Sequence, residues 1–126
     1  MEQTHRGAVI SGWIISTLII LFMLVDGFGH VMKFAPYVKG TMDVGYPESV
    51  IMPLGIVELV ITLLYAIPRT RIIGAILLTA YFGGATATHV RMGQPFYFPV
   101  VFGILVWLGL YLRDARLRSY IPLTNP

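Results

Sequence analysis

The chain has 126 residues, of which 56% are hydrophobic and 12% are charged. Because an ordinary globular domain carries about 25% charged residues, this composition excludes a water-soluble domain, and the length leaves no room for a separate soluble catalytic module. The sequence contains no cysteine, which excludes disulfides, thiol redox chemistry and iron–sulfur clusters made by this chain alone.

Four apolar stretches fill most of the sequence, over residues 8–32, 47–67, 71–90 and 96–112. A helix needs about 20 residues to cross the hydrocarbon core of a bilayer, and each stretch supplies about that number. The sequence therefore predicts an all-α integral membrane protein. We expect a single domain over residues 1–126, built as an antiparallel bundle of four transmembrane helices.

The first stretch ends in ionisable residues. Asp26 and His30 are four positions apart and Lys33 follows, so the three share one face if the helix continues through the neighbouring glycines. An ionisable group inside a span is costly and is therefore a functional-site candidate. The link from Lys33 to Tyr46 has about 14 residues, which is long enough to be functional or to carry a short interfacial helix.

Glu58 lies near the middle of the second stretch. A bare carboxylate at that depth is costly, so we expect Glu58 to be protonated or to be held by a cation or by polar partners. Two interpretations follow from the sequence. Glu58 either joins two helices by a hydrogen bond or belongs to a ligand or proton site.

The third stretch carries a run of small residues, from Gly83 and Gly84 through Thr86 to His89. Such runs let helix backbones approach closely, so we expect Gly83 and Gly84 to face another helix at short range. His89 and Arg91 end the stretch on the same side as His30. Two histidines there permit haem ligation, but a polar cap of the bundle is favoured over haem, and without cysteine or a close histidine pair no metal site is predicted.

The basic residues lie at the ends of the spans, which favours membrane topology over nucleic-acid binding as the reason for the net charge of +3. With four spans, one side of the membrane holds Arg6, Arg69, Arg71, Arg113, Arg116 and Arg118. The other side holds Lys33, Lys39 and Arg91. The positive-inside rule therefore predicts that both termini are cytoplasmic.

The segment Leu77–Arg91, with its Gly-Gly-Ala-Thr-Ala-Thr-His run, resembles the DoxX-like family of small four-helix bacterial membrane proteins. The residues around His30, Glu58 and Pro99 agree with that resemblance. It implies a multi-pass protein of the bacterial inner membrane. Relatives include a small subunit of a thiosulfate:quinone oxidoreductase, and related four-helix proteins line a ligand pocket with acids, so the resemblance favours a quinone or another apolar ligand.

These observations predict a pocket on the outer half of the bundle that binds a quinone-like or other amphipathic small molecule, in a redox-linked system. The predicted ligand-binding residues are Asp26, His30, Glu58, Thr86, His89 and Arg91. Two alternatives stay open. One is an accessory or chaperone-type subunit of a membrane oxidoreductase or other membrane complex, or a homo-oligomer; the other is an enzyme with Glu58 and His89 as acid and base. No residue is identified as catalytic by the sequence alone.

Overall fold

The computed structural model of the protein describes residues 2–121, and within that range it contains helices and no strands. The elements in chain order are α1 (Glu2–Val31), α2 (Ala35–Asp43), the 3₁₀-helix η1 (Glu48–Val50), α3 (Ile51–Ala66), α4 (Arg71–Arg91), α5 (Tyr97–Arg113) and α6 (Ala115–Tyr120). The predicted all-α class is confirmed. The link after Lys33 carries a short helix, α2, as its length allowed.

Three segments are long and apolar enough to cross a membrane: Arg6–Val31, Glu48–Ala66 and Arg71–Arg91. The fourth apolar helix, α5, has 17 residues, which gives a length of about 25 Å at about 1.5 Å per residue. Large apolar side chains point outward along these helices; Leu18 is 63% exposed and Ile104 is 60% exposed. Lipid would cover such a surface.

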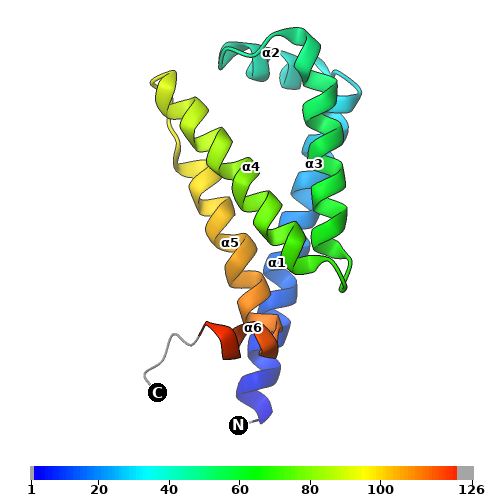
Figure 1. The fold of residues 1–126 in the computed structure, drawn as a ribbon, viewed down its shortest axis with the longest axis vertical. Coiled ribbons are helices and arrows are strands. Elements are labelled where there is room, and N and C mark those ends of the chain that lie inside the picture. The colour runs from blue at the N-terminus through cyan, green and yellow to red at the C-terminus, as the bar shows by residue number, and fades with distance from the viewer. Residues whose placement is uncertain (1, 122–126) are drawn as a thin grey trace.

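The four long helices pack in a ring in which α1 contacts α3 and α5, and α4 contacts the same two helices. Figure 1 shows that α4 leans away from α1 and α3 toward the end of the molecule that α2 covers. We call this end the α2 end. The opposite end, where α6 lies, is the α6 end, and there residues 67–70 join α3 to α4 in a tight turn.

Glycines bring α1 close to its neighbours at the α2 end. A Cβ atom at Gly55 of α3 would lie 2.8 Å from the carbonyl oxygen of Gly27 and 2.8 Å from the Cβ of His30. A Cβ atom at Gly29 would overlap the ring of Tyr37 on α2. Only glycine fits at these crossings, and they fix α2 and α3 against the last turns of α1.

The prediction that Gly83 and Gly84 face another helix at close range is wrong. A Cβ atom at either position would meet no atom within 4 Å. The reason is that the two glycines face cavities on opposite sides of α4, Gly83 a cavity toward α5 and Gly84 a cavity toward α1, α2 and α3.

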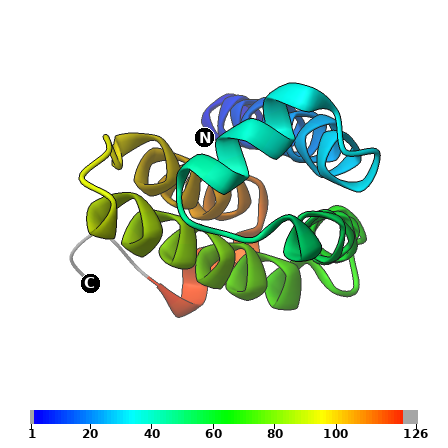
Figure 2. The same ribbon diagram turned by 90° about the horizontal axis from the view of Figure 1, so that it is seen from above.

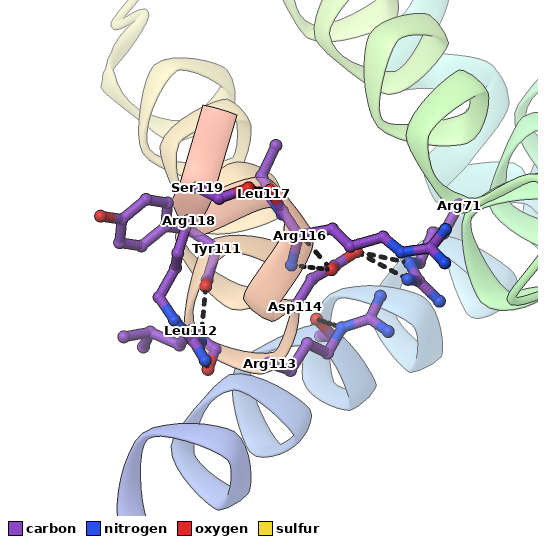
Figure 3. A network of polar contacts seen from close by, with 10 residues as sticks. Arg71, Tyr111, Leu112, Arg113, Asp114, Arg116, Leu117, Arg118 and Ser119 are labelled. Atoms are coloured by element: carbon purple, nitrogen blue, oxygen red, sulfur yellow. Dashed lines mark hydrogen bonds and ion pairs between the residues drawn. The ribbon is translucent and has the colours of Figure 1, made fainter. Parts of the chain in front are cut away.

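At the α6 end, polar side chains tie the helices together. Arg71 at the start of α4 pairs with Asp114, with 2.7 Å between Nη2 and Oδ2 (Figure 3). Asp114 also caps α6, because its Oδ1 accepts hydrogen bonds from the backbone amides of Arg116 and Leu117. Burial alone would raise the pKa of Asp114, but the Arg71 guanidinium and these amides outweigh it and hold the pKa below its usual value.

Candidate functional site

Two cavities flank α4. The larger, of about 790 Å³, lies between α4 and α5 and is lined almost entirely by apolar side chains, among them Phe82, Ile104 and Trp107. The smaller, of about 470 Å³, lies at the α2 end between α1, α2, α3 and α4. We take the smaller cavity as the candidate site, because it gathers carboxylate and imidazole side chains, which the larger one lacks, and we call it the polar cavity.

The wall of the polar cavity combines acids, imidazoles and hydroxyl groups with small apolar residues. Its polar lining residues are Asp26, His30, Tyr37, Thr41, Tyr46, Tyr81, Thr88 and His89. Its apolar lining residues include Val44, Leu54, Ala80 and Ala85, and Gly84 contributes open space. Ligand pockets commonly have this mixture of an apolar wall with a few convergent polar groups.

Three of the predicted site residues meet beside this cavity. Nδ1 of His30 lies 3.3 Å from Oδ2 of Asp26 and 3.7 Å from Oε2 of Glu58. The close glycine contact between Gly27 and Gly55 explains the encounter, since it brings the last turns of α1 against the middle of α3. We call Asp26, His30 and Glu58 the acid–histidine cluster.

The orientation of the His30 ring follows from its hydrogen bonds. The Thr41 hydroxyl donates to the backbone oxygen of Tyr37 at 2.8 Å, so its oxygen can only accept from Nε2 of His30, 3.1 Å away. Nε2 therefore carries a hydrogen. Nδ1 then points to the acids, and its nearest neighbour is the backbone oxygen of Asp26 at 2.8 Å.

Glu58 is completely buried. Its Oε2 accepts a hydrogen bond from the Tyr81 hydroxyl at 3.1 Å, while its Oε1 has no hydrogen-bond partner among the described residues. A buried polar atom without a partner is rare in proteins and calls for an explanation. Glu58 itself does not line the polar cavity, although its partner Tyr81 does.

The other predicted site residues are distributed differently. His89 lines the polar cavity, and its Nδ1 donates to the backbone oxygen of Ala85 at 2.7 Å. Thr86 lines the apolar cavity on the opposite side of α4. The Arg91 guanidinium reaches the link between α2 and η1, where it lies beside Gly45.

The sequence analysis missed the hydroxyl groups of the cavity, namely those of Tyr37, Thr41, Tyr46, Tyr81 and Thr88. Single threonines and tyrosines in apolar helices are too common to stand out by type. For α4, however, helical spacing could have predicted the cavity face. Tyr81, Ala85, Thr88 and His89 lie at intervals that place them on one side of the helix.

In a comparison with protein families, the model of the DoxX-like family matches residues 14–109, about three quarters of the chain. That range contains the whole acid–histidine cluster. Comparisons with curated proteins and with solved structures find no match. The resemblance noted in the sequence is thereby confirmed. The chain belongs to the DoxX-like family.

Proposed function

We propose that this protein binds an amphipathic small molecule with a hydrogen-donating head group, such as a quinol, in the polar cavity. The observation that carries the proposal is the hydrogen-bond inventory of that cavity. Four of its five lining hydroxyls already donate: Thr41 and Thr88 to backbone oxygens, Tyr81 to Glu58, and Tyr46 to the oxygen of Thr88. Tyr37 is the fifth, and no partner for it lies among the described residues.

What the cavity still offers is mostly acceptors. Because Nδ1 of His89 donates to Ala85, a neutral His89 presents a lone pair at Nε2. The carboxylate of Asp26 is 28% exposed and also accepts. A head group with hydroxyl or amino hydrogens therefore satisfies these groups, whereas a head group with acceptors alone leaves them unpaired.

The cavity size and its position in the bundle support the same proposal. Its volume of about 470 Å³ lies within the range of about 300–1,000 Å³ typical of small-molecule sites. It lies at the α2 end, where α4 leans away from α3 (Figure 1), and we propose that a head group enters there while an apolar tail stays in lipid.

This proposal includes a membrane topology. All four long helices cross the bacterial inner membrane as an antiparallel bundle, with the α6 end in the cytoplasm and the polar cavity toward the outer leaflet. The cluster of arginines at the α6 end supports this orientation. A reporter fused after Pro126 should read as cytoplasmic and one inserted between Lys39 and Asp43 as external; the reverse result would overturn the orientation.

The two glycines of α4 supply a matched pair of variants for the binding site. Gly84→Leu fills the polar cavity and Gly83→Leu fills the apolar cavity, and neither side chain meets an obstacle at its Cβ. We expect Gly84→Leu to weaken binding of the quinol form of a short-tailed benzoquinone at least tenfold, and Gly83→Leu to leave it unchanged. Equal effects of both variants would refute the assignment of the cavity.

The head-group chemistry has its own test. The reduced and oxidised forms of the same short-tailed benzoquinone differ in whether the head donates or accepts hydrogen bonds. We expect the quinol to bind at least tenfold more tightly than the quinone in detergent solution. If the oxidised form binds better, the inventory of acceptors does not select the ligand.

The accessory-subunit alternative makes a different prediction for the purified protein. A chain that binds a ligand by itself should be stable alone and should carry a small molecule that solvent extraction and mass spectrometry identify. A chain that serves as a subunit should be stable only together with its partner complex. The same purification therefore decides between the two functions.

A further inference from the structure

The acid–histidine cluster carries a second proposal, which does not depend on what fills the polar cavity. We propose that Asp26, His30 and Glu58 bind one divalent transition-metal ion, with Nδ1 of the imidazole, an oxygen of Asp26 and one or both oxygens of Glu58 as ligands. One ligand atom from each of the three residues lies within 4.8 Å of the other two. No metal site was predicted from the sequence, because it contains neither cysteine nor a close pair of histidines. The fold instead places two carboxylates beside one histidine.

The spacing of the ligand atoms fits a metal ion. Nδ1 of His30 lies 3.3 Å from Oδ2 of Asp26 and 3.7 Å from Oε2 of Glu58. A tetrahedral site with bonds of about 2.1 Å has ligand–ligand edges of about 3.4 Å. The two observed distances bracket that value, and the third edge, between the two carboxylates, is at most 4.8 Å, so side-chain adjustments would complete the coordination.

The hydrogen bonds of His30 orient its ring so that Nδ1 faces oxygen atoms and can bind a cation. Nε2 donates to Thr41, and an outer partner of this kind is what orients a metal-binding imidazole. The neighbours of Nδ1 are oxygen atoms of Asp26 and Glu58, which all bear lone pairs. A lone pair on Nδ1 would be repelled there unless a proton or a metal ion lay between them.

The charges favour a divalent ion over a proton. No lysine or arginine pairs with either carboxylate among the described residues; Lys39 pairs with Asp43, Lys33 is exposed and Arg91 lies beside Gly45. Protons would have to bind both His30 and Glu58 to neutralise the two carboxylates, whereas one divalent ion neutralises both. In a buried setting an uncompensated carboxylate is costly.

Glu58 provides the independent sign of a ligand. It is fully buried, its Oε2 faces His30, and its Oε1 has no hydrogen-bond partner among the described residues. Coordination through both oxygens of Glu58 would give Oε1 the partner that the fold does not supply. One imidazole with two carboxylates suits zinc, manganese, iron or cobalt better than calcium or magnesium, and three protein ligands leave a fourth position open.

The test uses the full chain in detergent, purified on a tag without histidine, stripped with a chelator and titrated with Co²⁺ and Zn²⁺. We expect one Co²⁺ per chain, with the intense visible absorption of a tetrahedral site, displaced by Zn²⁺. Glu58→Gln should lower the affinity at least tenfold. Asp43→Asn, which removes an exposed carboxylate at the same end, should bind as the wild type does.

A second variant keeps the proposal open to refutation if Glu58→Gln does not fold. Thr41→Val removes the acceptor that orients Nε2 without touching a ligand atom, and it should lower Co²⁺ affinity several-fold. Gly84→Leu should retain the metal even where it loses an organic ligand, which separates this proposal from the one above. Absence of stoichiometric Co²⁺ in the wild type, or equal binding by Glu58→Gln, would show that the positive centre is a proton.

Discussion

The two ends of the bundle use similar polar side chains in different ways. At the α6 end, Asp114 is enclosed by Arg71 and by backbone amides, and the Tyr65 hydroxyl donates to the Val106 carbonyl at 2.7 Å and lies 3.0 Å from the Ser16 hydroxyl. The Asp114 carboxylate and the Tyr65 phenol are both buried. At the α2 end, the acid–histidine cluster and its hydroxyls border a cavity.

This difference separates stability from binding. A polar group whose partners are all within the chain contributes to folding, and its removal leaves those partners unsatisfied. A polar group with unused hydrogen-bonding capacity has that capacity available for a ligand. The α6 end should therefore lose stability when its polar groups are changed, and the α2 end should lose binding.

The largest effect should come from the backbone contact that holds the α2 end together. Gly55→Val would place a side chain against the Gly27 carbonyl and the His30 Cβ, and we expect a loss of about 3 kcal/mol or more in unfolding free energy. Thermal unfolding in detergent measures it. Gly83→Val, with open space at its Cβ, is the control, and equal losses in the two variants would contradict the α1–α3 crossing.

The next effect concerns the ion pair at the α6 end. Asp114→Asn should cost about 1–3 kcal/mol, because it weakens the hydrogen bonds from Arg71 and the α6 cap together. Asp43→Asn, in an exposed pair with Lys39, should cost under about 0.5 kcal/mol. If the two substitutions cost the same, the α6 end is not held by its polar contacts.

The same pair predicts a pH dependence with a definite sign. The pKa of Asp114 is held below its usual value, so its contribution is fully present above about pH 4, the pKa range of an unfolded aspartate. The contribution is lost as the pH falls through the lower pKa of the folded state. Unfolding curves between pH 7 and pH 3 should show a smaller acid loss for Asp114→Asn than for the wild type.

A smaller effect is expected from Tyr65→Phe. The substitution removes the hydroxyl that contacts Ser16 and donates to the carbonyl of Val106, and that carbonyl keeps its hydrogen bond within α5. We expect a loss of about 1 kcal/mol, the usual size for one intramolecular hydrogen bond. A loss near zero in thermal unfolding would mean that these hydroxyl contacts do not stabilise the α6 end.

The smallest effect on stability should come from Glu58→Gln. The amide keeps the shape of the side chain and can still accept from Tyr81, and Oε1 has no bond to lose. We expect a change within about 0.5 kcal/mol in the chelator-treated protein, alongside the loss of metal affinity described above. A large destabilisation would instead place Glu58 with the structural groups of the α6 end.

The fold was predictable from the sequence because span length and hydropathy are local properties. The four predicted spans correspond to α1, to η1 with α3, to α4 and to α5, with ends that differ by a few residues except at the start of α1. Which helix faces pack against each other was harder to predict from the sequence. Gly83 and Gly84 looked like contact residues, whereas Gly27, Gly29 and Gly55 make the contacts, because composition does not tell which helix faces a glycine.

Part of the candidate site was also predictable, because it depends on local properties of the sequence. Asp26 and His30 are neighbours by helical spacing, and burial of Glu58 follows from its depth in a span. Thr86 shares a face with Thr79, Phe82 and Gly83, at intervals of three and four residues, and this face lines the apolar cavity. Helical spacing could thus have separated Thr86 from His89, but the meeting of Glu58 with His30 depends on the α1–α3 crossing.

The short helix α2 has a practical consequence for observing this protein at work. It touches His30 through Thr41 and packs Tyr37 on Gly29, while Lys39 on the same helix is exposed. Because the chain has no cysteine, a Lys39→Cys variant carries a single thiol for a fluorophore or a spin label. Such a label would report any displacement of α2 in real time, and it would place no added group inside the polar cavity.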